Sequence, residues 1–304
     1  MTHQWQTQRE RGNRFALQLL TWIALHLGRR VIFFILCFVV SHYFLVARKA
    51  RKASQSFLAR ALRRQPSRWE IYCHLLTFAI VSVDRIFFLS GREALFDIRV
   101  YGNELFETYQ ERGCFLLTTH LGSFDVIRVM GMGRRNKALP VSIVLDIQHN
   151  ANVLQLLQSL DPCLAANVID ARTPAPALAL ILSEAIAAGK LVGIMADRCT
   201  TADRITAVDF FGEPANFPQG VWHLASILQA PVITCFGIYK GGNRYDLHFE
   251  LISDQLGSSR KDRADAIAAG MQLYADRVQE LARDNPFNWF NFYDFWHNET
   301  TKHH

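Results

Sequence analysis

An uncharged run of 17 residues, residues 31–47, constrains this 304-residue chain more than any other feature. Arg29 and Arg30 precede it, and four Lys or Arg residues follow within five positions. A helix that spans a bilayer needs about 17 to 25 apolar residues, so the run is just long enough. A second apolar stretch, residues 15–28, ends at the same arginine pair. We predict a membrane anchor, either a short tilted span or an in-plane hairpin whose flanking cations reach headgroups; the alternative is buried core helices.

Positive charge is concentrated at this end of the chain. Residues 1–68 contain 13 Lys or Arg and one acidic residue, a net charge of +12, whereas the remainder carries 20 basic and 26 acidic residues, a net charge of −6. Cations beside apolar helices favour an anionic membrane surface. They do not lie on a recognition element, which argues against nucleic acid as a partner. We therefore divide the chain into an anchor, residues 1–55, and a second domain, residues 56–304.

The sequence pattern of the second domain is typical of an α/β fold. Short β-branched or apolar runs alternate with helical stretches, which is typical of a sheet flanked by helices. The predicted strands lie in FDIRVYG, CFLLTTH, PVSIVLD, NVID, KLVGIMAD, PVITCFGIY and YDLHFELIS, and the predicted helices in residues 152–160, 176–188, 221–228 and 264–282. Six cysteines form no CxxC pair, so we interpret them as small buried hydrophobic residues rather than metal ligands. We predict a mixed sheet with helices on both faces.

The loop after the strand CFLL carries the first candidate site, THLGSFD. His120 and Asp125 can pair if His120 precedes a helix, Gly122 permits a bend and Ser123 caps the helix. A carboxylate on one ring nitrogen fixes the tautomer and leaves the other nitrogen as a base toward a hydroxyl. The alternative is a core histidine beside an aspartate that serves the helix dipole.

Two further loops are rich in polar residues. After the strand KLVGIMAD come Asp197 and Arg198, and then the loop FFGEPANFPQG, where Gly220 and Val221 open a helix directly after Pro218 and Gln219, so that its free N–H groups could receive an anion. Arg198 could add a fixed positive charge, although Asp197 and Arg198 could equally form a plain surface ion pair. The loop KGGNRY offers Arg244, and its alternative is an ordinary hairpin turn.

These motifs occur in a specific order along the chain: THLGSFD, DR after a hydrophobic strand, FFGEPANFPQG, APVITCFG, YDLHFE and NPFNWFNFYDFW. Over essentially residues 10–297 the sequence resembles the late (secondary) acyltransferases of lipid A biosynthesis, in the lysophospholipid acyltransferase superfamily. The resemblance implies a lysophospholipid acyltransferase-like fold, an inner bacterial membrane, and a catalytic domain on its cytoplasmic side. It also implies His120 as general base and Asp125 as its orienting acid. From the two polar loops we predict substrate contacts at Asp197, Arg198, Gln219, Gly220 and Arg244.

The implied reaction moves a fatty acyl group from a thioester, usually that of acyl carrier protein, to a hydroxyl of a membrane lipid or glycolipid. Thioester acyl transfer needs a base, donors for the oxyanion and an apolar slot, so we expect neither cofactor nor metal. A metal-dependent hydrolase would need a third ligand besides His120 and Asp125, and the chain has no HExxH. Arg134, Arg135 and Lys137 follow the first loop, where they could dock the acidic carrier or simply end a solvated helix.

The acceptor and the donor stay open at this stage. In place of the superfamily's FPEG followed by Thr and Arg stand Phe217, Pro218, Gln219 and Gly220, then Val221, which disfavours lysophosphatidate as acceptor. Lipid A, an aminolipid and an aryl polyene acceptor are all compatible with the motifs, as is coenzyme A in place of acyl carrier protein. A non-catalytic membrane scaffold for a lipid biosynthetic complex is the alternative outside enzymology.

Overall fold

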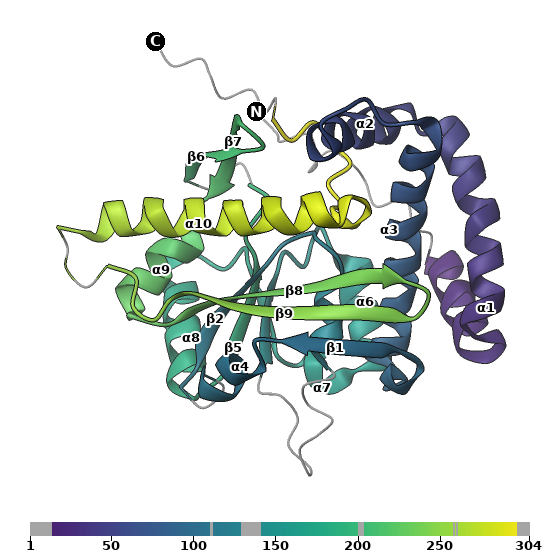
Figure 1. Ribbon diagram of the computed structural model, residues 1–304. Helices are drawn as coiled ribbons and strands as arrows, with labels where there is room; N and C mark the ends of the chain where they lie inside the picture. Colours follow the sequence, from purple (N-terminus) through teal and green to yellow (C-terminus); the bar gives the residue numbers. More distant parts are fainter. Residues whose placement is uncertain are drawn as a thin grey trace.

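Three helices form the N-terminal side of the protein. The computed structural model describes residues 14–109, 112–128, 141–199, 204–257, 259 and 261–296. Its first helices are α1 (Arg14–Val46), α2 (Arg48–Leu62) and α3 (Arg68–Leu89). Figure 1 shows α1 beside α3 at one end of the sheet, with α2 above them. The apolar segment that follows Pro66 therefore forms α3.

The two predicted apolar stretches form a single helix with a break between them. Gly28 has a φ of 82°, in the left-handed region that glycine adopts without steric cost. Beside it, Arg29 donates from Nε and Nη2 to the two carboxylate oxygens of Asp84 on α3, over 2.7 and 2.8 Å. Tyr245 donates its hydroxyl to Asp84 as well, over 2.8 Å. Arg29 thus pairs inside the protein, and our expectation that it reaches lipid headgroups is wrong.

Much of the apolar surface of α1 is exposed. Phe34, Phe38 and Leu45 leave 73%, 79% and 69% of their surface accessible. Within the described residues two helices, α1 and α3, are long and apolar enough to cross a membrane by length and composition. They differ in burial, because α3 packs its apolar side chains mostly inside the protein whereas α1 leaves most of its own outside. Of these two helices, α1 is therefore the one with a large uncovered apolar face.

A seven-stranded sheet forms the centre of the molecule, in the order β1-β9-β8-β2-β5-β3-β4. Neighbouring strands are parallel except β8 and β9, which form an antiparallel hairpin. The strands are β1 (Asp97–Tyr101), β2 (Cys114–Thr118), β3 (Val141–Leu145), β4 (Val168–Asp170), β5 (Leu191–Met195), β8 (Val232–Gly241) and β9 (Arg244–Ser253). The predicted mixed sheet is confirmed, and β2 lies at its middle.

Strand β2 is buried on both faces because helices cover both sides of the sheet. All five of its residues are buried, and alternate side chains enter different cores: Phe115 and Leu117 in one, Cys114 and Leu116 in the other. Figure 1 shows α10 across one side of the sheet. The remaining helices are α4 (Asn103–Tyr109), α6 (Ala151–Leu160), α7 (Pro162–Ala165), α8 (Ala175–Ala187), α9 (Gly220–Leu228) and α10 (Arg263–Asp284), with 3₁₀ turns η1 (Glu93–Leu95), η2 (Phe124–Arg128) and η3 (Pro286–Asn288).

The segment FFGEPANFPQG, which we expected to be a loop, is largely a β-hairpin. Strands β6 (Ile205–Phe210) and β7 (Glu213–Pro218) pair in antiparallel fashion. Phe211 and Gly212 make the turn with φ values of 62° and 79°. Two successive positive φ angles match the right-handed twist of the flanking strands. Phenylalanine rarely takes the first of these positions, so the turn could not be predicted from the sequence.

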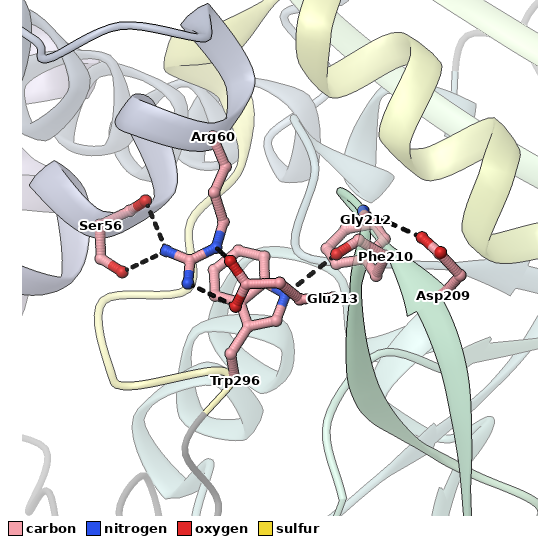
Figure 2. A network of polar contacts seen from close by, with 7 residues as sticks. All are labelled: Ser56, Arg60, Asp209, Phe210, Gly212, Glu213 and Trp296. Carbon is pink, nitrogen blue, oxygen red and sulfur yellow. Dashed lines mark hydrogen bonds and ion pairs between the residues drawn. The ribbon is translucent and has the colours of Figure 1, made fainter.

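A polar network ties this hairpin to α2 and to the C-terminal segment (Figure 2). Arg60 donates to both carboxylate oxygens of Glu213, over 3.1 and 2.7 Å, and to Ser56 on its own helix. Its guanidinium lies 4.2 Å from the ring centroid of Trp296. Trp296 in turn donates from Nε1 to the carbonyl oxygen of Phe210, over 3.0 Å. The helix, the hairpin and the tail are therefore held together at one point.

The connection between α2 and α3 is short. Helix α2 continues to Leu62, and Ser67 caps α3 through a capping box with Glu70. Residues 63–67 alone join the two helices. The predicted domain boundary between residues 55 and 56 falls inside α2, where Ser54 and Phe57 are both buried. The division of the chain into anchor and domain stays a prediction.

Candidate active site

His120 stands just beyond the carboxyl end of the central strand β2. Asp197 follows the neighbouring parallel strand β5, so the two side chains emerge at the same edge of the sheet. The ring nitrogen Nδ1 of His120 lies 2.9 Å from Oδ1 of Asp197, and the backbone N–H of His120 donates to Oδ2 over 3.1 Å. The imidazole is 23% exposed and the Asp197 carboxylate is fully buried. The strands thus bring a partly accessible base onto a buried acid.

The partner on Nδ1 determines the tautomer of the imidazole. An ionised carboxylate only accepts hydrogen bonds, so Nδ1 carries the proton and Nε2 presents a lone pair. Burial and the charge of Arg198 lower the pKa of His120, against the opposing effect of Asp197. Burial acts to raise the pKa of Asp197, but the charge of His120 and its hydrogen bond outweigh it and hold that pKa well below its usual range. A neutral imidazole against an ionised carboxylate is the expected state near neutral pH.

The C-terminal segment completes the surroundings of Asp197. Asn291 donates from Nδ2 to Oδ2 of Asp197 over 2.9 Å and accepts from Nε of Arg198 over 2.7 Å. Arg198 also donates to the carbonyl oxygen of Phe290, over 3.0 Å, and the N–H of Phe290 donates to the carbonyl oxygen of His120, over 2.7 Å. Asp197 and Arg198 therefore form an inward network rather than a plain surface pair. We did not predict Asn291, because only its position between aromatic residues marks it in the sequence.

The bend after His120 depends on two glycines that touch. Gly122 has a φ of 70°, and a Cβ built on it would stand 2.0 Å from the carbonyl oxygen of Gly237 on β8. The N–H of Ser123 donates to that same oxygen over 2.7 Å, and the N–H of Gly122 donates to the carbonyl oxygen of Asn288, over 2.8 Å. This close approach leaves no room for a side chain at residue 122. It fixes the direction in which the chain leaves His120.

Asp125 does not occupy the place that we predicted for it. It lies in the short 3₁₀ turn η2, and its Oδ2 accepts from Nε of Arg85 on α3 over 2.6 Å. No hydrogen bond joins it to His120 within the described residues. The Nδ1 position belongs to Asp197, because the parallel register sets the ends of β2 and β5 side by side. The expected cap is also missing, since the buried Oγ of Ser123 has no partner in the described part of the chain.

The other predicted substrate contacts lie elsewhere in the fold. Gln219 precedes α9, where its Nε2 donates to Thr206 and its N–H donates to the carbonyl oxygen of Arg204, over 2.8 Å. Gly220 is the first residue of α9, as predicted. Arg244 begins β9 and donates to both carboxylate oxygens of Asp246, over 3.2 and 3.1 Å. No hydrogen bond in the described residues links these three to His120, and their substrate roles stay predictions.

Two further expectations concern the docking residues and the absence of a metal site. Arg134, Arg135 and Lys137, the predicted docking residues, fall outside the described residues. A metal site would need several ligands at one place. Within the described residues, no group of three or more His, Cys, Asp or Glu side chains could hold a metal ion.

Comparison with protein families identifies one match that covers most of the chain. Residues 15–298 match the family model described as bacterial lipid A biosynthesis acyltransferase. The match includes α1, the whole sheet and the C-terminal segment that carries Asn291. A search among curated proteins found no match.

Proposed function

The chain belongs to the bacterial lipid A biosynthesis acyltransferase family, and we propose that it moves a fatty acyl group from an acyl thioester to a hydroxyl of a membrane lipid or glycolipid. The observation that carries this proposal is the contact of 2.9 Å between Nδ1 of His120 and Asp197. It leaves Nε2 of a partly exposed imidazole as the proton acceptor. Acyl transfer to an alcohol requires such a base.

The proposed reaction needs no residue to form a covalent intermediate. Nε2 of His120 takes the hydroxyl proton as the acceptor oxygen attacks the carbonyl carbon of the thioester. The tetrahedral intermediate then collapses, the carbon–sulfur bond breaks, and the imidazolium returns its proton to the leaving thiolate. The products are an ester and a free thiol, and His120 is neutral again.

Asp197 is the residue that we assign to orient His120. Its two oxygens hold the ring nitrogen and the backbone N–H of the same residue, which fixes both the tautomer and the position of the imidazole. Its carboxylate also stabilises the imidazolium that forms during proton transfer. Asp125, the acid of the THLGSFD motif, would then act on His120 indirectly, through Arg85. Its contact with Arg85 fixes a positive charge that helps to lower the pKa of His120.

The donor and the acceptor are the finer parts of the proposal. We infer acyl carrier protein as the donor, docked by Arg134, Arg135 and Lys137, with coenzyme A as the alternative. Arg198, Gln219, Gly220 and Arg244 remain the proposed substrate contacts. The acceptor is lipid A or its precursor in our first proposal, and an aminolipid or aryl polyene in the second. Lipid extracts of cells with and without the gene, compared by mass spectrometry, distinguish these acceptors.

The family and the exposed apolar face of α1 support membrane association. The exposed Phe34, Phe38 and Leu45 of α1 would lose their contact with water in a bilayer, and each such side chain contributes about 1.5 to 3 kcal/mol when fully buried. We propose the bacterial inner membrane as the location, with the sheet on the cytoplasmic side, where acyl thioesters are made. A high-salt wash of isolated membranes should leave the protein in the pellet, because apolar insertion is not screened by salt.

The direct test of the proposal is the substitution His120→Ala. We expect the rate of acyl transfer to fall by about 10² to 10⁴-fold, while the protein stays folded and membrane-bound. The assay follows labelled acyl chains from an acyl carrier protein thioester to a lipid extract. Transfer at the wild-type rate by purified His120→Ala would reject the mechanism. It would favour the alternative of a non-catalytic scaffold, whose activity in cells does not depend on this side chain.

A further inference from the structure

A cavity lies away from His120, at the corner where the first three helices meet. Its volume is about 290 Å³, and it forms where α1 ends, α2 begins and α3 begins. Its lining consists of Phe44, Arg48, Arg51, Lys52, Gln55, Pro66, Arg68 and Ile71. No residue of the candidate active site belongs to this lining. We call Arg48, Arg51, Lys52 and Arg68 the basic corner.

The charge of the basic corner is uncompensated. Half of the residues around the cavity are cations, and none is acidic. Arg48, Lys52 and Arg68 are exposed and form no ion pair with any carboxylate of the described residues. The nearest acid in sequence, Glu70, is already occupied by Arg64, over 2.5 and 3.0 Å, and by the N–H of Ser67. A concave site lined by unpaired cations attracts an anion.

Two further features strengthen the positive potential and hold its shape. Helix α2 begins at Arg48, so the positive end of its dipole lies at the cavity wall, and the opposing carbonyl end of α1, which stops at Val46, is covered there by Arg51. Arg51 is held in place because it donates to the carbonyl oxygens of Phe44 and Leu45, the latter over 2.8 Å, and lies 5.4 Å from the centroid of the Phe44 ring. One cation is thus preorganised, and the others are free to close on a ligand.

Exposed apolar surface leads directly into the cavity. Leu45 and Val46, at the end of α1, are exposed next to the wall residue Arg48, and the exposed side of α1 continues through Phe38. On the other side Trp69 is 68% exposed and stacks on Tyr72. Tryptophan with one apolar face and one polar edge is typical of the membrane interface. A ligand suited to both surfaces has an anionic head and apolar chains.

We propose that the basic corner binds the phosphate group of an anionic membrane lipid whose acyl chains lie along the exposed face of α1. Drug-sized ligands occupy about 300 to 1,000 Å³, so this cavity suits a headgroup rather than an entire lipid. The site goes beyond the proposed acyl transfer and does not depend on it, because no residue of the His120 network takes part. It also differs from diffuse attraction to a charged surface, which would use every exposed cation of the region alike.

The test compares two variants that remove the same charge. Arg48→Gln with Arg68→Gln removes two cations of the basic corner; Lys49→Gln with Arg63→Gln removes two exposed neighbours that do not line the cavity. Full-length protein in neutral detergent is titrated calorimetrically with three probes. They are six-carbon phosphatidylglycerol, inorganic phosphate, and the diacylglycerol of the same chains.

We expect saturable binding of the phosphatidylglycerol that weakens at least about tenfold in the cavity variant and by less than about threefold in the control. Inorganic phosphate should bind more weakly than the lipid. Neither pair of substitutions should change the binding of the diacylglycerol. Arg48→Lys with Arg68→Lys should retain most of the affinity. Thermal unfolding of every variant confirms that the fold is intact, as expected for exposed side chains without partners.

Three results would overturn the proposal. Equal losses in the cavity variant and the control would mean diffuse attraction rather than a site. Inorganic phosphate that binds as tightly as the lipid would mean a free-anion site with no lipid contact. Phosphatidylglycerol binding that the cavity variant leaves unchanged would mean that the cations do not bind the headgroup. None of these results bears on the His120→Ala test, so the two proposals fail separately.

Discussion

Two loops supply an acidic residue near His120, and the two carboxylates differ in burial and in their hydrogen-bond partners. Asp197, after β5, is fully buried and receives hydrogen bonds from His120, from its backbone N–H and from Asn291. Asp125, after β2, is closer in sequence but faces Arg85, in a pair that is partly exposed. The difference shows that neighbouring strands, rather than neighbouring positions in a motif, decide which acid contacts His120.

The largest expected effect separates the two acids directly. Asp197→Asn should lower kcat on the order of 10³ to 10⁴-fold, because an amide can present its NH₂ to the imidazole and stabilise the wrong tautomer. Asp125→Asn should cost no more than about tenfold, the value of one partly exposed ion pair. Steady-state rates with one thioester donor measure both. Equal losses would restore the pairing of His120 with Asp125 that the motif predicts.

A smaller effect is expected at Asn291, which stabilises only one of the two acids. Asn291→Ala leaves Oδ2 of Asp197 and Nε of Arg198 without this partner, so the free energy of unfolding should fall by about 1 to 3 kcal/mol. Turnover should fall about tenfold, the worth of one lost hydrogen bond to a charged group. The matched control is Asn285→Ala in the same segment, whose Oδ1 accepts from exposed Lys240. If the control matched Asn291→Ala in turnover, the effect would be general to the tail.

The dependence of activity on pH gives a finer measure of the same network. Because burial and Arg198 lower the pKa of His120, the neutral imidazole persists below the ordinary histidine value of about 6.5, and kcat/KM should stay constant to below that pH before it falls. Arg198→Gln removes a cation, so the pKa of His120 rises and the acid limb moves to higher pH. Stability should likewise decline as pH falls below the ordinary value, since the unfolded chain binds the proton more readily. A limb unmoved by Arg198→Gln would mean that another group titrates.

The smallest effect concerns the brace, our name for the contacts of Arg60 with Glu213 and Trp296 that hold the C-terminal segment. Arg60→Gln removes the fork on Glu213 and the cation over Trp296, and should lower the free energy of unfolding by about 1 kcal/mol. Turnover should change less than about twofold, because Asn291 keeps its own contacts. A double-mutant cycle with Glu213→Gln isolates the pair, and Arg64→Gln serves as an exposed control. A loss of turnover as large as that of Asn291→Ala would make the brace part of the site.

Much of the fold could be predicted because local patterns determine it. The β-branched runs and the helical stretches became strands and helices within a few residues of their predicted ends, and β2 was predicted from the same run that places His120. The sequence did not show that residues 14–46 form one helix with a break at Gly28. A single span, a hairpin and a broken helix all have the same apolar composition. The hairpin of β6 and β7 was missed because Phe211 occupies a left-handed position that favours glycine or asparagine.

The candidate site was predicted only as far as its residues are local. His120 stands where the motif placed it, and Asp197 and Arg198 were singled out for the loop after β5. What the sequence does not contain is strand order, so the contact between residues 77 positions apart could not be inferred. Asn291 lies 94 positions from Asp197 and within a run whose aromatic side chains dominate the pattern. Partners brought together by tertiary packing need the fold before they can be named.

The joint that Arg29, Asp84 and Tyr245 form beside the break at Gly28 fastens α1 to α3 and to β9. A bilayer thinner or thicker than α1 is accommodated by tilting the helix. If α1 lies in the membrane as we propose, this joint would pass a change in its tilt on to the sheet, and so to the height of His120 above the lipid headgroups. Under the proposed acyl transfer, membrane thickness would then affect which hydroxyl of the acceptor His120 can reach.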